Sequence, residues 1–246
     1  MRERTRPALA ALSFLTAVPV ARGAEIGERD LRRGAVLFPV VGAAVGSLVA
    51  SVAWGASFLV PPFAAAVLGV ASGVAVTAAF HLDGLGDVAD GIGASLTGRE
   101  PAEVMRDPRL GTFGVAAVAL DLLLKASVIS ALVVDGFPWA VVAAGALSRV
   151  AAIALAWRLP YAGGGTGVWT EGVGAGTTAV AFGLALAIAV PSARLATAGM
   201  VAAIAAIALV VGWWSSRRLG GVTGDGFGAA IELGETLAFV AAVAMR

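Results

Sequence analysis

Long apolar runs separated by short polar segments dominate this chain. A helix needs about 20 consecutive apolar residues to cross the hydrocarbon core of a bilayer. Windows of that kind, bounded by charges, glycine or proline, cover residues 35–60, 62–80, 113–134, 138–157, 177–193, 195–214 and 225–245. Helices satisfy their own backbone polar groups, so they are the default spanning structure. The pattern predicts an all-α, polytopic membrane helix bundle of about seven transmembrane helices, with residues 1–246 forming a single integral membrane domain.

The N-terminal segment, residues 1–34, follows a different pattern. Basic residues precede a short apolar run, as in a secretory signal, but Pro19 and Arg22 stand where a cleavage site requires small residues. We therefore expect a short N-terminal interfacial helix, within a cytoplasmic or interfacial segment that covers 1–34.

The composition of the chain supports the membrane assignment. Apolar residues make up 59% of the 246 positions and charged residues 13%, against roughly 45–50% and 25% in soluble domains. So few charges could not cover a soluble globule, which excludes a soluble domain, a disordered chain and a nucleic-acid binder. The chain has no cysteine and a single histidine, His81, which excludes thiolate chemistry and histidine-rich metal centres.

Basic residues are distributed unevenly between the segments that join the windows. Residues 1–34 hold seven of them and residues 81–112 hold three, whereas Arg194 and Arg246 are the two expected on the opposite side. The positive-inside rule places the N-terminus and the 81–112 segment in the cytoplasm, and an odd number of spans places Arg246 outside.

The 81–112 segment is the longest and most polar connection, and we expect it to be a cytoplasmic active-site loop. Asp83, Asp87 and Asp90 recur at i, i+4 and i+7, so on a helix they would share one face. Neighbouring carboxylates repel one another unless a cation lies between them, and oxygen ligands suit Mg²⁺, Mn²⁺ or Ca²⁺. Mg²⁺ commonly bridges carboxylates to substrate phosphates. The alternative is a solvated Asp/Gly-rich turn, but the cluster directly follows an apolar window, which favours a metal–phosphate site.

Several cations stand where they could bind an anion. Arg106 and Arg109 precede a helix start, where they either recognise phosphate or anchor a span on the cytoplasmic side. Lys125 lies four residues after Asp121 inside a window, and the two either neutralise each other or face a polar cavity. Arg149 has no acid nearby in its window, so its partner lies on another helix or is a bound anion.

The last window opens with the sequence GGVTGDGFGAAIELGE, residues 220–235. Thr223 and Asp225 stand at the expected helix start, where Asp225 is a candidate N-cap. Glu232 and Glu235 follow on roughly the same helical face. These acids suggest a second wall of one polar cavity, and the alternative is a capped helix whose acids reach toward the interface.

Two further residues have simpler interpretations. Tyr161, the single tyrosine, precedes a run of glycines and is expected in a flexible cytoplasmic loop. His81 is expected to be a hydrogen-bonding residue at a helix end rather than a metal ligand.

Taken together, these motifs resemble the cobalamin synthase family, the adenosylcobinamide-GDP ribazoletransferases. The resembling stretches occur in the family's order over nearly the whole chain: FLTAVPV at 14–20, FPVVGAAVG at 38–46, HLDGLGDVADGIGA at 81–94, VMRDPRLGTFG at 104–114, SR at 148–149 and the 220–235 motif. Two positions depart from the family pattern, because Gly86 replaces an alanine and PYAGGGTG at 160–167 lacks a basic residue.

The resemblance implies an enzyme of the bacterial inner membrane that joins adenosylcobinamide-GDP to α-ribazole or its 5′-phosphate with Mg²⁺, late in vitamin B12 synthesis. It implies that Asp83, Asp87 and Asp90 hold Mg²⁺ and that one of them accepts the hydroxyl proton. The implied substrate-binding residues are Arg106, Arg109, Lys125, Arg149, Thr223, Asp225 and Glu232. The expected partners are the two substrates and the lipid bilayer, without nucleic acid, and glycine-rich helix faces permit a homodimer.

Two other classes share part of this pattern. A CDP-alcohol phosphatidyltransferase also gathers aspartates and glycines at a cytoplasmic helix end, but its acids are more widely spaced, and Gly86 and Asp87 occupy its Ala-Arg position. An ion-coupled transporter would concentrate its polar residues near the bilayer midplane, whereas the densest polar cluster here lies in a cytoplasmic connection.

Overall fold

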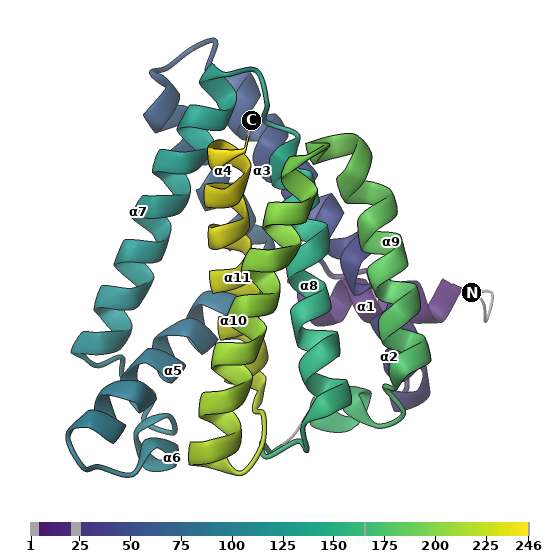
Figure 1. Cartoon of the computed structure of the whole chain (residues 1–246), viewed down its shortest axis with the longest axis vertical. Coiled ribbons are helices and arrows are strands. Elements are labelled where there is room, and N and C mark those ends of the chain that lie inside the picture. The colour runs from purple at the N-terminus through teal and green to yellow at the C-terminus, as the bar shows by residue number, and fades with distance from the viewer. Residues whose placement is uncertain (1–4, 21–25, 165, 246) are drawn as a thin grey trace.

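The computed structural model describes residues 5–20, 26–164 and 166–245, and every regular element within these ranges is helical. Figure 1 shows an upright bundle with the C-terminal end at the top and the chain's shorter helices around its lower half. In chain order the elements are α1 (Arg6–Leu15), α2 (Glu28–Gly34), η2 (Ala35–Leu37), α3 (Phe38–Ala56), α4 (Pro62–Thr77), α5 (Phe80–Leu96), α6 (Pro101–Val104), α7 (Thr112–Val134), α8 (Ala140–Arg158), η3 (Thr166–Thr170), α9 (Ala175–Ala193), α10 (Ala196–Leu219) and α11 (Gly224–Ala244).

Helices long and apolar enough to cross a membrane confirm the predicted polytopic all-α bundle. Six of them lie within the described ranges: Glu28–Ala56, Thr112–Val134, Ala140–Arg158, Ala175–Ala193, Ala196–Leu219 and Gly224–Ala244. Helices α4 and α5 make a seventh candidate if they count as one broken span, with a bend of 92° between them. The protein is therefore a multi-pass membrane protein. Arg246, which the charge distribution places outside, falls beyond the described residues.

The bend between α4 and α5 corrects the expectation of an 81–112 loop. The first half of that segment is helix α5, and the second half holds the short helix α6 and the turns around it. Leu82, Leu85 and Val88 recur at i, i+3 and i+6 and are buried on one face of α5, which is the spacing of an amphipathic helix. The apolar window 62–80 ends where the Asp- and Gly-rich stretch begins. Hydropathy alone does not distinguish the polar face of a helix such as α5 from a loop.

Two consecutive alanines produce the bend. Ala78 and Ala79 have φ values of 51° and 58°, in the left-handed region, which costs a non-glycine residue roughly 1–2 kcal/mol. The carbonyl of Val76 at the end of α4 accepts a hydrogen bond from the N–H of Ala17 at 2.8 Å. The chain after α1 therefore satisfies a backbone group that the end of α4 leaves free.

Close helix crossings hold the bundle together. A Cβ atom on Gly42 of α3 would overlap the carbonyl oxygen of Gly145 in α8, and one on Gly145 would overlap that of Gly42. Helix α8 is the most enclosed of the six spans, and α9 is the most exposed to the surroundings. Small residues at such crossings let backbones approach without intervening lipid.

The N-terminal helix α1 packs on this bundle. Ala10, Ala11 and Leu15 are buried, and a Cβ atom on Gly34 would overlap the carbonyl of Pro7. A short apolar helix is thus present where one was expected. Its position relative to the membrane interface stays a prediction.

Candidate active site

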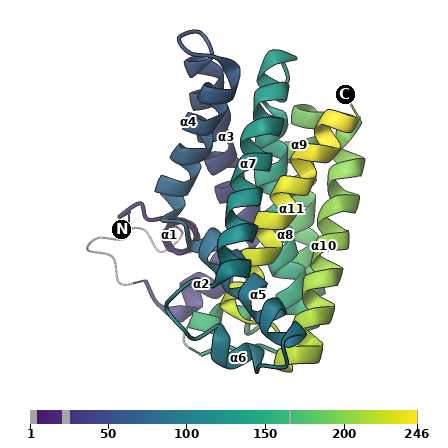
Figure 2. The ribbon, with the colours of Figure 1, turned by 90° about the vertical axis from the view of Figure 1, so that its left-hand side faces the viewer.

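Helices α5 and α11 cross at the lower end of the bundle, with backbone in contact (Figures 1 and 2). A Cβ atom on Gly84 would lie 2.9 Å from Cα of Asp225, and one on Gly228 would lie 3.3 Å from Cα of His81. The absence of side chains at Gly84 and Gly228 therefore allows the crossing. As a result, Asp83 and Asp87 of α5 face the first turn of α11.

We call Asp83, Asp87 and Asp225 the acidic cluster. Asp83 is exposed, while Asp87 and Asp225 are half-buried. Asp87 interacts repulsively with Asp225, Asp83 and Asp90, and Asp225 with Asp83. Within the described part of the chain, no member of the cluster forms an ion pair. Among the described residues, no cation is thus paired with these three carboxylates at the helix crossing.

Asp90 has a different environment from the cluster. Its carboxylate accepts hydrogen bonds from the N–H of Gly111 at 2.6 Å and of Gly114 at 2.9 Å. Gly111 is the N-cap residue of α7 and has no side chain to cap the helix itself. Asp90 therefore caps α7 from a neighbouring helix and connects α7 to α5. The positive end of the α7 dipole stabilises the Asp90 carboxylate at this position.

Thr223, not Asp225, caps helix α11. The side chain of Thr223 accepts a hydrogen bond from the N–H of Gly226 at 3.2 Å. Asp225 lies inside the first turn. There the positive end of the helix dipole stabilises its carboxylate, although the carboxylate does not make the cap hydrogen bond. The expectation that Asp225 is the N-cap is wrong, because Thr223 stands two residues earlier at the extended position that a cap requires.

The donor set of the acidic cluster fits a hard divalent cation. In the described ranges, no group of three His, Cys, Asp or Glu side chains is placed so that it could hold a metal ion as a protein cage. Mg²⁺ seldom uses such a cage, since one or two protein carboxylates, waters and substrate phosphates usually complete its shell. Exposed and half-buried carboxylates that repel one another suit an ion that binds together with a diphosphate.

Arg106 and Arg109 lie in the exposed connection between α5 and α7. Arg109 donates two side-chain hydrogen bonds to Asp107, at 2.9 and 2.8 Å. These bonds lower the pKa of Asp107 to about 2, so Asp107 stays charged and keeps the guanidinium engaged. Among the described residues, neither arginine is hydrogen-bonded or ion-paired to the acidic cluster.

The charged residues inside the bundle neutralise one another across helices. Lys125 of α7 pairs with Asp121 at 3.4 Å and also donates a hydrogen bond to Glu232 of α11. Arg149 of α8 donates to Glu235 of α11. The partner expected for Arg149 on another helix is thus Glu235, and the Asp121–Lys125 pair extends to a third member.

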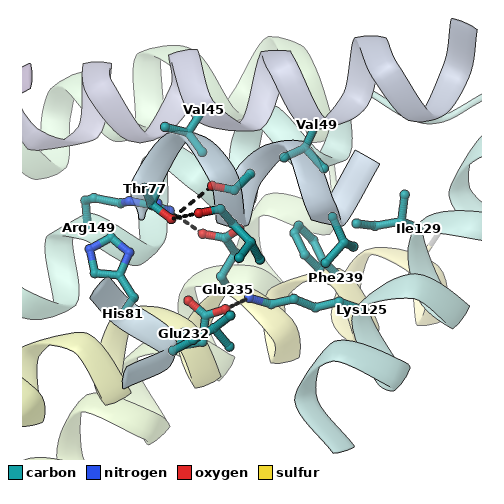
Figure 3. A pocket seen from close by; sticks show the side chains of 14 residues that line it. Val45, Val49, Thr77, His81, Lys125, Ile129, Arg149, Glu232, Glu235 and Phe239 are labelled. Carbon is teal, nitrogen blue, oxygen red and sulfur yellow. Dashed lines mark hydrogen bonds and ion pairs between the residues drawn. The ribbon is translucent and has the colours of Figure 1, made fainter. Parts of the chain in front are cut away.

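These ion pairs line a small cavity (Figure 3). Its volume is about 40 Å³, room for roughly three water molecules and far below the several hundred cubic ångströms of a ligand pocket. His81 also faces it and is buried, and its ring makes no hydrogen bond to another described residue. Lys125, Arg149 and Glu232 therefore line a water-sized cavity rather than a chamber for a nucleotide or corrinoid.

Comparison with known proteins identifies the family. The family model for cobalamin-5-phosphate synthase matches residues 7–243. The chain belongs to this family. It is 39% identical to an adenosylcobinamide-GDP ribazoletransferase of Klebsiella pneumoniae, over 94% of this chain and 97% of the relative. It is 34% identical to one of Ralstonia nicotianae, over 96% and 94%, and 35% identical to one of Roseiflexus, over 93% and 85%. No solved structure matches it.

One residue beside the cluster was not expected there. Tyr161, assigned from the sequence to a flexible loop, forms an isolated parallel bridge with Val222, directly before α11. Its ring stacks on Phe227 with centroids 6.2 Å apart. Family membership and local pattern give no sign of this pairing, because it joins segments about 60 residues apart in the chain through backbone contacts. The family's match to 7–243 includes this segment.

Proposed function

We propose that this protein joins adenosylcobinamide-GDP to α-ribazole or α-ribazole 5′-phosphate, giving adenosylcobalamin or its phosphate and releasing GMP. Family membership over nearly the full chain supports this reaction. The observation that carries the proposal is the acidic cluster: Asp83, Asp87 and Asp225 converge from two helices with no described cation to offset them.

The reaction transfers a phosphoryl-linked group between two oxygens. A hydroxyl oxygen of ribazole forms a new bond to the phosphorus next to cobinamide, and the bond from that phosphorus to the bridging oxygen of the diphosphate breaks. GMP leaves with the electron pair, and the hydroxyl proton passes to a carboxylate. The exposed Asp83 is the member of the cluster best placed to accept that proton.

Asp83, Asp87 and Asp225 would hold Mg²⁺. When bound, the ion neutralises the diphosphate and stabilises the leaving group. Asp90 contributes by fixing α5 against α7 through two backbone hydrogen bonds. Arg106 and Arg109, on the same side of the bundle, would attract the anionic donor to the site.

The proposal includes an orientation in the membrane. The segments before α3 and around α6 carry most basic residues, which supports a cytoplasmic N-terminus and a cytoplasmic active site in the bacterial inner membrane. A homodimer stays a prediction.

A reconstitution assay tests the function. The purified full-length protein, in detergent or liposomes, is mixed with adenosylcobinamide-GDP, with and without α-ribazole and Mg²⁺. We expect GMP release only when both are present. GMP release without ribazole would indicate a hydrolase, and no release under any condition would overturn the proposal.

A further inference from the structure

Two contacts fix Tyr161 against the start of α11, the segment that carries Asp225. Before Asp225, Val222 donates an N–H hydrogen bond to the carbonyl of Pro160 and accepts one from the N–H of Ala162, both at 2.9 Å. After Asp225, Phe227 stacks on the Tyr161 ring with an interplanar angle of 8°. Val222 and Phe227 flank Asp225 in the sequence, so Tyr161 packs against the same start of α11. Its phenol also interacts electrostatically with the Asp225 carboxylate.

The Tyr161 ring has little freedom to move. A Cβ atom on Gly163 would lie 2.6 Å from the phenol oxygen, and one on Gly167 would overlap the ring. Gly163 and Gly167 thus lie close against the Tyr161 side chain, and Phe227 stacks on its ring. Phe227 is itself packed against the buried Trp169, with centroids 5.0 Å apart. The hydroxyl is therefore held in place before any ligand binds.

The hydroxyl of Tyr161 is available as a donor. In the described structure its one hydrogen bond goes to the carbonyl of Gly164 at 3.3 Å, longer than the usual range of about 2.5–3.0 Å for O–H···O bonds. A phenol carries its proton at neutral pH, so the Tyr161 hydroxyl can donate a hydrogen bond to an anionic oxygen.

A diphosphate bound at the acidic cluster needs such donors. The cluster carboxylates themselves repel phosphate oxygens, and among the described residues Arg106 and Arg109 do not contact the cluster. A neutral hydroxyl can donate a hydrogen bond to a phosphate oxygen. Unlike an arginine, it would not form an ion pair with Asp225.

We propose that Tyr161 donates a hydrogen bond to a phosphate oxygen of the diphosphate-containing donor, beside Asp225. The inference rests on the proposed function. It assigns Tyr161 to the nucleotide donor and not to the ribazole acceptor, so it predicts an effect on one substrate alone.

Tyr161→Phe tests the inference because it keeps the ring stacked on Phe227 and removes only the hydroxyl. Equilibrium binding of adenosylcobinamide-GDP to the detergent-solubilised protein with Mg²⁺ is measured, and binding of α-ribazole is measured separately. We expect the Kd of the donor to rise roughly tenfold or more, the usual effect of losing a hydrogen bond to a charged group. The Kd of α-ribazole should not change.

Trp169→Phe is the matched control. It alters the same aromatic stack without touching the hydroxyl, so it should change thermal stability and leave the donor Kd near the wild-type value. An unchanged donor Kd in Tyr161→Phe, or equal changes for donor and acceptor, would overturn the role of Tyr161. If wild-type protein released no GMP at all, the proposed function would fail first, and the two failures are thus distinguishable.

Discussion

Four aspartates lie near the crossing of α5 and α11, and their surroundings separate them into two roles. Asp83, Asp87 and Asp225 are exposed or half-buried and have no described cationic partner. Asp90 is buried and both of its oxygens accept backbone hydrogen bonds. The same side chain therefore serves as a candidate metal ligand at three positions and as a helix cap at the fourth.

Asp83→Asn should abolish most of the activity without impairing insertion into the membrane. Amide for carboxylate keeps the shape but removes the charge that holds the cation, so we expect GMP release to fall by at least roughly 10–100-fold. Glu103→Gln is the control, since it removes an exposed acid from α6 on the same side of the bundle. Near-normal turnover in Asp83→Asn would remove this residue from the metal site.

Asp90→Asn should act on stability more than Asp83→Asn does. One carboxylate oxygen that accepts a hydrogen bond from the N–H of Gly111 or Gly114 becomes an amide NH₂ group, which cannot accept it. Leaving that buried N–H without an acceptor lowers the free energy of unfolding by about 1–3 kcal/mol. Thermal unfolding in detergent measures the difference between the two variants. If Asp90→Asn melted like the wild type while losing all activity, its role would be in the chemistry instead.

At the scale of elements, the α4–α5 bend sets the direction of the helix that carries Asp83 and Asp87. A straight continuation of α4 would carry these residues along the span, whereas the 92° bend turns α5 across the end of α11. The left-handed conformations of Ala78 and Ala79 make that turn.

Ala78→Gly should not destabilise the protein. Glycine relieves a strain of about 1–2 kcal/mol, which offsets the roughly 0.4–1 kcal/mol of added entropy in the unfolded chain. Ala75→Gly, three residues earlier in regular helix, is the matched comparison and should cost about 1 kcal/mol. Equal destabilisation of the two variants in thermal unfolding would argue against a left-handed conformation at Ala78.

At the scale of the whole molecule, two buried ion-pair groups join α11 to the helices around it. Glu232 connects it to α7 through Lys125, and Glu235 connects it to α8 through Arg149. Because α11 also carries Asp225, these pairs fix the helix that carries Asp225 against α7 and α8. Their effect on the reaction is thus indirect.

Arg149→Met should destabilise the fold strongly, by about 3–5 kcal/mol, because it leaves the Glu235 charge buried without a partner. Arg149→Met combined with Glu235→Met should recover much of that loss, since both charges are then removed. Thermal unfolding and GMP release measured on both variants separate stability from activity. A stable but inactive double variant would show that Arg149 or Glu235 acts in the reaction and not only in the fold.

The sequence was sufficient for the main features of the fold and for part of the site. Apolar windows located the spans because the bilayer requires long, uncharged helices. The i, i+4 spacing correctly placed Asp83 and Asp87 on one helical face, even though their segment was expected to be a loop. Family motifs located both α5 and the start of α11.

Other features depend on contacts between distant segments, which no local pattern encodes. The Arg149–Glu235 pair, the capping of α7 by Asp90 and the pairing of Tyr161 with Val222 all join separate elements. The α4–α5 bend was missed as well, because alanine normally favours a continuous helix. Tertiary packing overrode that preference at Ala78 and Ala79.

The acidic cluster is proposed to bind a divalent cation together with the diphosphate of the donor. Anomalous scattering from Mn²⁺, in crystals grown with adenosylcobinamide-GDP, would locate that cation. We expect a Mn²⁺ peak within coordination distance of Asp83 and Asp87, with the diphosphate on the same ion. A metal peak elsewhere, or a nucleotide bound away from the α5–α11 crossing, would contradict it.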